Sequence, residues 1–573
     1  MNINRRGLLG LLGAAAPGLA DAMPIEIVSP PVYRHGVASG DPLASSVVLW
    51  TRLSGPRPDP SDHLDEGKPD AYGVYDGASA HGRCQVALDR GFRRIVKAVE
   101  FATDSARDWT VKVIIEGLQP ATTYYYRFVC NGGYSPVGRT RTLPVGPTKD
   151  VVLAAATCSL WQGGYFNAYQ AIADLKRVNA VLHLGDYIYE YGKDGYGAEQ
   201  GRRLNRFVDP PHEIVTLADY RRRHAQAKSD PKLQAAHARA PWIVVWDDHE
   251  SANDTWQGGA ENHQPDKEGD WATRKAAAIR AYFEWMPIRE PAPGRMRDSI
   301  WRSFEFGDLA TLVMVETRMS ARSKQLTYAA DLPGLGDNPD VAAFKARLTD
   351  PARRLMSPEQ EAWLSDELKR SVAGGKAWQV IGNQVVMARV TAPDFAKTMG
   401  QGGFEALLAS QAANARKRLQ RTGDLAALGL PYNLDSWDGY PADRERVYGA
   451  FTAAKGRPIV LSGDSHAFWA NELADASGRR VAAEFGATGI TSPGYGDAVP
   501  DAPVGQAFAD ANPEVLFNDS SAKGFVLLTL TREQARADLM AVSTIMEESF
   551  TTRSAASFTV DAEPGGVGPV KRV

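Results

Sequence analysis

The chain has 573 residues, of which 44% are hydrophobic and 23% are charged, and its formal net charge is −3. At roughly 100–200 residues per domain, this length predicts about three domains, or one large domain and a smaller one. The composition is that of a globular protein, and the slightly acidic balance argues against a domain that binds a nucleic-acid backbone. With only 3 cysteines, a disulfide-stapled scaffold is excluded and at least one thiol stays outside any intramolecular pair.

The first 22 residues have the pattern of an export signal. Arg5 and Arg6 precede an apolar Gly/Ala-rich run from Leu8 to Leu19, and Ala20–Ala22 has the form of a cleavage site. The run is shorter than the roughly 20 residues that span a bilayer. We therefore expect residues 1–22 to be a Tat-type signal peptide, with export to the periplasm or the medium by the Tat translocase and no stable membrane anchor.

Residues 28–145 are predicted to form a β-sandwich. Alternating runs rich in β-branched and aromatic residues indicate strands at Ser46–Leu53, Arg83–Asp89, Trp109–Leu118 and Thr123–Asn131. The segment from Leu118 to Tyr124 resembles the corner of fibronectin type III-like domains, in which a tyrosine hydroxyl closes the turn. Cys84 and Cys130 both fall on these strands, and the sequence leaves open whether they pair or stay as buried free thiols.

From residue 146 to residue 562 the pattern changes to that of a layered α/β domain. Helical stretches such as Phe166–Val178 and Trp271–Met286 lie between continuous apolar runs, which are typical of strands buried on both faces. These runs are Val151–Thr157, Ala180–Asp186, Trp242–Asp248, Leu309–Thr317, Trp378–Asn383, Pro458–Asp464 and Lys523–Thr531. Residues 563–573 are expected to form a flexible tail.

Residues that can bind a metal follow five of the predicted strands. They are Cys158, Asp186 with Tyr189, Asp248 with His249, Asn383, and Asp464 with His466. One aspartate after a strand is usually a cap or turn residue, but five such strand ends are harder to explain in that way. Because ligands of α/β sheets bind beyond the carboxyl ends of the strands, the pattern predicts a metal site there. Two nearby cations would suit phosphoester hydrolysis.

Five segments, taken in order, closely resemble the PhoD-type alkaline phosphatase/phosphodiesterase family of the calcineurin-like metallophosphoesterase superfamily. They are Gly36–Leu53, Thr157–Tyr169, His183–Gly192, Trp246–Asp254 and Leu461–Trp469. The resemblance spans nearly the whole chain after the signal. It implies a four-layer metallophosphoesterase sandwich at 146–562 behind the N-terminal β-sandwich, and a centre of Fe3+ with one or more Ca2+ ions.

The resemblance also implies a role for each residue near iron. Asp186 is expected to bridge the metals, and Tyr189 to bind iron as a phenolate. Cys158 occupies the position at which related enzymes have a carboxylate ligand of the iron. A thiolate ligand at this position is the expected difference between this family and those enzymes. His466 is the fourth expected iron ligand.

For the second metal the resemblance implies Asp248, Asp464 and Asn383, with Asn383 standing where related enzymes use a histidine. His249 is expected beside the scissile phosphate, as a catalytic residue that also binds substrate. Asp247 is left out of the ligands, as a residue that caps or orients His249. Arg318 is a candidate for binding the phosphate, with a salt bridge as the alternative.

The predicted function is that of an exported phosphomonoesterase/phosphodiesterase that scavenges phosphate. One alternative keeps the chemistry but acts on phospholipid headgroups, as a phospholipase D-like diesterase; no basic amphipathic helix favours it. The other is a secreted binding module with purely structural metals. A structural site saturates its coordination and has no need of a residue such as His249 beside it.

Overall fold

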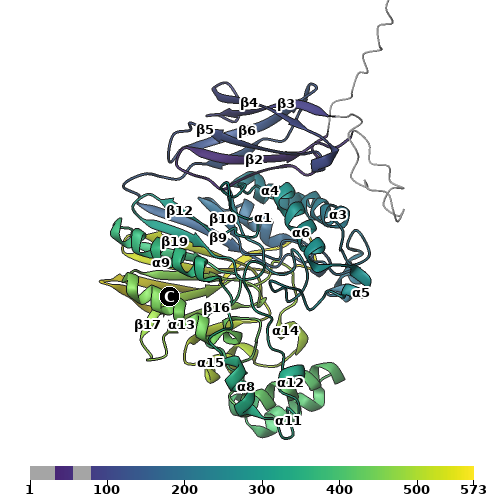
Figure 1. Cartoon of the computed structure of the whole chain (residues 1–573), viewed down its shortest axis with the longest axis vertical. Helices are drawn as coiled ribbons and strands as arrows, with labels where there is room; N and C mark the ends of the chain where they lie inside the picture. The colour runs from purple at the N-terminus through teal and green to yellow at the C-terminus, as the bar shows by residue number, and fades with distance from the viewer. Residues whose placement is uncertain (1–31, 56–78) are drawn as a thin grey trace, which may run out of the picture.

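The computed structural model describes residues 32–55 and 79–573, which form three β-sheets and the helices around them (Figure 1). The expected signal peptide at 1–22 lies outside the described residues. Among the helices in those two ranges, none has the length and apolar character needed to cross a membrane.

Two large sheets lie face to face at the centre of the molecule. The first has the order β22 (Gly566–Arg572), β21 (Thr552–Glu563), β20 (Gln534–Val542), β19 (Lys523–Thr531), β9 (Asp150–Ala156), β10 (Ala180–His183), β11 (Trp242–Val244), β1 (Val37–Gly40), β2 (Ser46–Arg52) and β5 (Thr110–Glu116). The second has the order β12 (Arg302–Phe306), β13 (Ala310–Met314), β14 (Trp378–Gly382), β15 (Pro458–Ser462), β17 (Arg480–Gly486), β16 (Phe468–Ala474) and β18 (Val515–Asp519).

Alternation along the strands explains why the second sheet has helices on only one face. Val380 and Ile459 point into the core shared with the first sheet, whereas their neighbours Ile381 and Val460 point into a separate core. That separate core is closed by α9 (Pro358–Ala373) and α13 (Pro441–Ala454). The first sheet is covered on its outer face by α1 (Asn167–Ala173), and further helices pack around it: α3 (Leu217–Ser229), α4 (Pro231–Arg239) and α6 (Trp271–Trp285). The predicted four-layer α/β sandwich is confirmed.

The N-terminal β-sandwich is also present, at the top of Figure 1. Its second face is the sheet β4 (Ile95–Thr103), β3 (Ala80–Ala87), β6 (Thr123–Cys130), β7 (Gly133–Tyr134), with β8 (Gly138–Arg141) on β6. The predicted tyrosine corner is confirmed, because the backbone N–H of Gln119 donates to Tyr124 Oη at 2.9 Å. Cys84 and Cys130 are both buried and form no disulfide, with Cys84 opposite Phe128 in the strand register.

One sheet runs through both halves of the molecule, which the sequence did not predict. β1 of the N-terminal sandwich pairs in parallel with β11, at Gly40 opposite Trp242. A Cβ at Gly40 would lie 2.0 Å from the carbonyl oxygen of Pro287, so only glycine allows this approach. The next residue, Asp41, is buried and forms a 2.7 Å ion pair with Arg302. This part of the Gly36–Leu53 motif therefore joins the two halves.

The prediction of a flexible tail at 563–573 is wrong. Residues Gly566–Arg572 form β22, which pairs with β21 through a hairpin at Glu563 opposite Gly566. Gly565 adopts a φ of +74°, which suits the turn, and Val567 and Val570 are buried. Glycine and proline interrupt this segment, and the buried Val567 and Val570 are three positions apart, so the sequence shows no period-2 alternation that would predict a strand.

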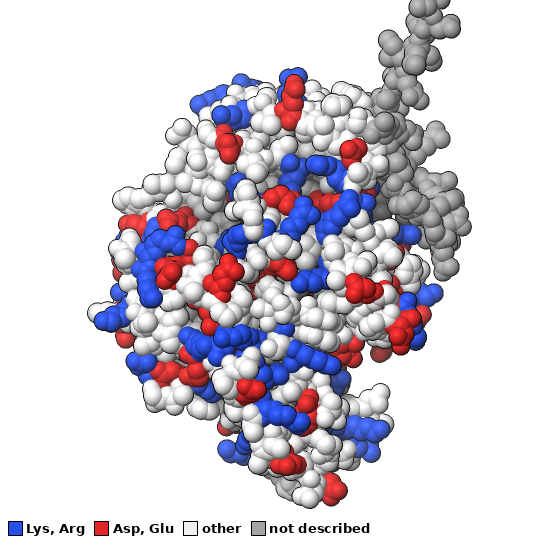
Figure 2. All heavy atoms as spheres, viewed as in Figure 1, with Lys and Arg blue, Asp and Glu red and all other residues white. Residues whose placement is uncertain are grey.

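A small helical lobe lies at the foot of the molecule (Figure 1). It contains α7 (Tyr328–Asp331), α8 (Val341–Leu348), α11 (Gln401–Ser410) and α12 (Ala413–Ala427), and residues from α7, α8 and α12 share a core of their own. The remaining helices are α2 (Ala198–Leu204), α5 (Pro265–Glu268), α10 (Phe395–Met399), α14 (Tyr495–Ala498) and α15 (Val504–Ala511). Positive and negative side chains alternate over the face seen in Figure 2, in keeping with a net charge of −3.

Buried histidines gather around Lys228, itself buried, beneath the N-terminal sandwich. Burial, followed by the charge of Lys228, lowers the pKa of both His183 and His224 to about 3. Neither ring nitrogen of His224 has a hydrogen-bond partner among the described residues, and the ring stacks on Trp285 at an interplanar angle of 10°. These histidines are therefore neutral in the folded protein, whereas in the unfolded chain they take up protons below about pH 6.5.

We expect acid to destabilise the protein through these groups. Because the folded-state pKa is depressed, stability is fully present above pH 6.5 and falls by about 1.4 kcal/mol per pH unit for each such histidine as the pH drops towards 3. His224→Phe should therefore reduce the loss of unfolding free energy between pH 7 and pH 5 by about 2 kcal/mol, measured by urea denaturation. His81→Phe, at an exposed histidine on β3, is the matched control and should change nothing. An unaltered pH dependence in His224→Phe would contradict the expectation.

Candidate metal centre

The predicted ligands come from loops at the carboxyl ends of strands in both central sheets. Cys158 follows β9, Asp186 follows β10, and Asp464 and His466 follow β15. Glycines let these loops approach one another: a Cβ at Gly185 would lie 2.3 Å from Asp247 Cβ, and one at Gly463 would lie 2.6 Å from Thr157 Oγ1. The glycine of each G-D motif thus brings the following aspartate into the site.

The backbone is strained at four of these ligands. Cys158, Asp186, Asp464 and His466 have φ values of 59°, 56°, 60° and 53°, in the left-handed region that non-glycine residues rarely adopt. Such conformations cost on the order of 1–3 kcal/mol each and cluster at functional sites, where the surrounding structure enforces them. Neighbouring loops supply that constraint here, since the N–H of Cys158 donates to Gly185 O at 3.2 Å.

Cys158, Asp186, Tyr189 and His466 meet in one group, here called the thiol cluster. Asp186 Oδ2 lies 3.4 Å from Cys158 Sγ and accepts a 3.0 Å hydrogen bond from Tyr189 Oη. His466 Nε2 lies 3.3 Å from the same hydroxyl. Burial, and after it the charge of Asp186, raises the pKa of the Cys158 thiol well above its usual range. A cation in the cluster is what would hold this thiol as a thiolate.

The ring of His466 is oriented by its outer nitrogen. Nδ1 lies 2.8 Å from the carbonyl oxygen of Pro493, to which it can only donate, and that oxygen also accepts a 2.8 Å hydrogen bond from Tyr196 Oη. The lone pair of the imidazole is therefore on Nε2, which faces the thiol cluster. An outer hydrogen bond that fixes the tautomer is typical of histidines that bind metals.

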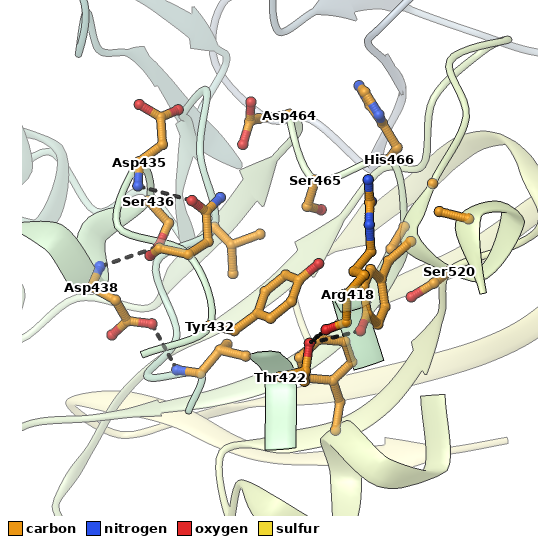
Figure 3. Close-up of a pocket in the computed structure, with 18 of the residues that line it drawn as sticks. Arg418, Thr422, Tyr432, Asp435, Ser436, Asp438, Asp464, Ser465, His466 and Ser520 are labelled. Carbon is orange, nitrogen blue, oxygen red and sulfur yellow. Dashed lines mark hydrogen bonds between the residues drawn. The ribbon is translucent and has the colours of Figure 1, made fainter. Parts of the chain in front are cut away.

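A second group, here called the carboxylate cluster, adjoins the first. It contains Asp247, Asp248, Asp254, Asp435 and Asp464, whose oxygens gather in two overlapping sets within 4.8 Å. Asp186 and His249 join it on the other side through Asp248. In Figure 3, Asp435, Asp464 and His466 lie along one rim of a cavity of about 750 Å³.

Arg318 is buried among these acids. Its Nε donates to Asp247, its Nη1 lies 2.7 Å from Asp435, and its Nη2 lies 3.4 Å from Asp464. Burial by itself lowers the pKa of Arg318, but the carboxylates outweigh it and raise the pKa well above the usual value. These contacts are the salt-bridge alternative considered for this residue, while its binding of phosphate stays a prediction.

Unsatisfied oxygens show that the two clusters fit metal ions. Asp186 Oδ1, Asp247 Oδ2 and Asp248 Oδ1 are buried without a hydrogen-bond partner among the described residues. Burial also raises the pKa of Asp186 and Asp464 well above the usual range, so a counter-charge is required to keep both ionised. Buried polar groups in native proteins are rarely left unpaired, and cations at these oxygens would satisfy all three.

His249 stands at the edge of both clusters and is held by a glutamate. Its Nδ1 lies 2.7 Å from Glu190 Oε2, while Glu190 Oε1 accepts hydrogen bonds of 2.8 Å from Asn253 N and Asn262 Nδ2. Burial lowers the pKa of His249, but the carboxylates of Asp248 and Glu190 outweigh it and raise the pKa well above its usual value. Glu190 thus holds the buried ring of His249 through Nδ1, beside Asp186 and Asp248.

Glu250 ties two of the loops together. Its Oε1 accepts the N–H of Tyr187 at 2.6 Å, and its Oε2 accepts the N–H groups of Asp186 at 3.0 Å and Asp247 at 2.8 Å. One carboxylate thus pairs three buried backbone donors from the loops after β10 and β11. This contact sets the position of Asp186 against that of Asp247.

Asn383 differs from the other predicted ligands. Its amide nitrogen donates to Val385 O, and its amide oxygen accepts a 3.2 Å hydrogen bond from Trp437 Nε1. Both ends of the side chain thus have partners in the protein core. Its role as a metal ligand stays a prediction, and these two contacts weigh against it.

Four buried or half-buried acids of the site were not picked out from the sequence. Glu190 and Glu250 lie in two of the segments that carry the family resemblance, next to Tyr189 and His249. Their carboxylates accept hydrogen bonds from backbone N–H groups, and such a contact has no signature in the sequence. Asp254 ends the Trp246–Asp254 segment, and its N–H donates to Asp248 Oδ2 at 2.6 Å. Asp435 lies in an irregular segment after α12, and only the fold brings it to Arg318. Asp247, which was set aside, also faces the carboxylate cluster.

The chain matches known proteins along almost its whole length. Residues 153–539 match the PhoD-like phosphatase family, and residues 20–144 match the N-terminal domain of PhoD-like phosphatases. Alkaline phosphatase D of Bacillus subtilis (strain 168) is 35% identical over 576 residues, which cover 98% of this chain and 86% of that protein. A solved structure described as "Structure of PhoD" aligns with a TM-score of 0.74 and 32% identity, covering 97% of this chain and 93% of the other.

The fold and the site together define a metallophosphoesterase, a hydrolase of phosphate esters. The chain belongs to the PhoD-like phosphatase family, whose members depend on metal. The alternative of a binding module with purely structural metals is therefore wrong.

Removing the Glu250 carboxylate should loosen the site. Glu250→Ala leaves three buried N–H groups unpaired, at about 1–3 kcal/mol each, so we expect a loss of several kcal/mol of unfolding free energy in chemical denaturation. Glu261→Ala is the matched control, because this exposed glutamate accepts a hydrogen bond from Asn253 Nδ2 in the same region. Equal stability of the two variants would show that the three hydrogen bonds do not hold the loops.

Proposed function

We propose that this chain hydrolyses phosphate mono- and diesters with an Fe3+/Ca2+ centre, as an exported enzyme that recovers phosphate. The observation that carries the proposal is the meeting of the thiol and carboxylate clusters at three buried oxygens that accept no hydrogen bond among the described residues, with His249 beside them. Family membership supports the class of reaction, and the donor atoms support the metals that the family resemblance implies.

The two clusters differ in the metal that they suit. Thiolate, phenolate and imidazole donors from Cys158, Tyr189 and His466 favour iron, whereas a set made only of carboxylates favours calcium. We infer that Asp186, which contacts the thiol cluster with Oδ2 and has Oδ1 without a hydrogen bond among the described residues, would help to hold both ions. Asp248 and Asp464 would then hold calcium.

The chain's own residues place a proton donor next to the reacting phosphate. When bound, the cations would neutralise the phosphate and supply an activated water. Glu190 fixes the ring of His249 through Nδ1, and the ring centroids of Tyr189 and His249 lie 4.2 Å apart. These two contacts set the orientation of Nε2. Because Glu190 accepts from Nδ1 and so favours the protonated ring, a proton on Nε2 can stabilise a phosphoryl oxygen or pass to the leaving oxygen.

The metal assignment is tested by composition and colour. The purified protein should contain iron and absorb visible light through a tyrosinate–Fe3+ pair, and Tyr189→Phe should remove or strongly shift that band. Cys158→Ala should lose iron while the N-terminal sandwich stays folded. Cys84→Ala changes a buried thiol far from the site and should keep the iron. A colourless, iron-free wild-type protein would refute the assignment.

The catalytic role of His249 is tested with 4-nitrophenyl phosphate, bis(4-nitrophenyl) phosphate and phosphatidylcholine. We expect the two nitrophenyl esters to be hydrolysed, and His249→Ala to lower kcat/KM by roughly 100- to 10,000-fold, as for the loss of a general acid. His212→Ala, at an exposed histidine paired with Asp219, should have the wild-type rate. Equal rates for His249→Ala and the wild type would exclude the proposed role.

The second candidate function is that of a phospholipase D-like diesterase on phospholipid headgroups. The cavity next to the clusters, at about 750 Å³, has room for a headgroup. Release of choline from phosphatidylcholine at a rate above that of the nitrophenyl diester would favour this candidate.

Export is proposed from the N-terminal residues. Arg5 and Arg6 ahead of the apolar run from Leu8 to Leu19 support recognition by the Tat translocase, with release to the periplasm or the medium.

A further inference from the structure

The cavity beside the metal clusters is larger than a phosphate group needs. Its volume of about 750 Å³ falls within the 300–1,000 Å³ that hold organic ligands of drug size. Asp254, Asp435, Asp464 and His466 line one end of it, so the space lies directly next to the proposed reaction centre. We therefore take this cavity as the place for a substituent on the phosphate.

Aromatic rings form the floor of the cavity. Tyr432 packs against Tyr495 at a centroid distance of 5.3 Å and against Phe508 at 5.0 Å, and Trp469 lies 5.2 Å from Phe508. In Figure 3, the ring of Tyr432 projects into the middle of the cavity. This surface suits the apolar part of an organic group.

α12 gives one side of the cavity a positive charge. Lys417, Arg418 and Arg421, all on α12, line it and are here called the basic wall. None of the three forms an ion pair with another side chain in residues 32–55 and 79–573, whereas Arg318 is surrounded by acids. Figure 3 shows Arg418 reaching up towards His466. The charge of the basic wall is thus available to a ligand.

α12 is fixed in its position along the cavity. Thr422, one turn after Arg418, has its Oγ1 2.8 Å from Tyr495 Oη, and both atoms are buried. Leu425, on the same face of the helix, packs into the core of the helical lobe. The basic wall is therefore held at a set distance from Asp464 and His466.

We propose that this cavity binds the retained organic substituent of a phosphodiester, and that Lys417, Arg418 and Arg421 bind a second anionic group on that substituent. The proposal rests on the proposed function, since it needs a phosphoester at the metal clusters. A substrate with two anions separated by an organic spacer matches cations at the metal clusters, aromatic rings along the cavity and a basic wall on α12. Phospholipase D-like cleavage would retain a diacylglycerol on the phosphate, which offers no second anion to the basic wall, and this argues against that alternative.

Two synthetic diesters that differ only in charge test this proposal. They are 4-nitrophenyl 4-carboxyphenyl phosphate and its 4-carbamoylphenyl analogue, and the release of 4-nitrophenol is followed for both. Wild-type enzyme should prefer the carboxylate by on the order of tenfold in kcat/KM, as expected for charge-assisted hydrogen bonds. This preference should shrink as the salt concentration rises, because the basic wall is exposed.

The triple variant Lys417→Gln/Arg418→Gln/Arg421→Gln should bring the ratio of the two kcat/KM values close to one. Arg416→Gln is the matched control on the same helix, because that guanidinium donates to Leu408 O at 2.8 Å and Gln411 O at 3.2 Å and does not line the cavity. It should keep the wild-type ratio. Folding of all variants is compared by thermal denaturation.

The possible failures are distinct. Equal wild-type rates on the two diesters would overturn the second-anion site and leave the proposed function intact. A triple variant that loses activity equally on both diesters would mean that α12 binds the reacting phosphate instead, which also overturns it. Hydrolysis of neither diester by metal-loaded wild-type enzyme would overturn the proposed function and this inference together.

Discussion

Buried negative charge is the constraint around which this molecule is built. Asp186, Asp247, Asp248 and Asp464 converge where the carboxyl ends of both central sheets meet, and leaving such groups ionised away from water is expensive. Cationic side chains, above all Arg318, offset part of this negative charge. Three carboxylate oxygens still accept no hydrogen bond among the described residues, which fits an arrangement that holds metal ions.

Holding so many acids together requires support from outside the clusters. Glu250 binds two loops through their backbone N–H groups, and Glu190 fixes the ring of His249 through Nδ1. The strained φ values at Cys158 and Asp186 can persist because these contacts and close-packed glycines leave the loops no alternative. The sheets behind the loops give the rigidity, since β1 extends the first sheet into the N-terminal sandwich.

Much of this architecture could be predicted from the sequence, because it is local in the chain. Cys158, Asp186 and Asp464 each follow an apolar run, and a buried strand with a polar end has a clear pattern. What could not be predicted depends on long-range packing. The pairing of β1 with β11 joins residues about two hundred positions apart with no shared periodicity, and Asp435 comes from a segment with no regular structure at all. At Asn383, a strand-end position alone does not decide whether the side chain faces the site or the core, and its contact with Trp437 lies in the core.

The helical lobe places the basic wall beside the metal clusters, so the proposed selectivity for the substituent on the phosphate comes from a separate part of the fold. The metal clusters are set by the sandwich and would accept any phosphate ester that reaches them. The basic wall belongs to α12, in a lobe with its own small core, and therefore can change its charge without disturbing the strands that hold the ligands. A monoester would leave that wall without a partner, whereas a diester with a distal anion would span the cavity. Selection would then act on the spacing between two negative charges, which Thr422 and Tyr495 fix by joining α12 to the floor of the cavity.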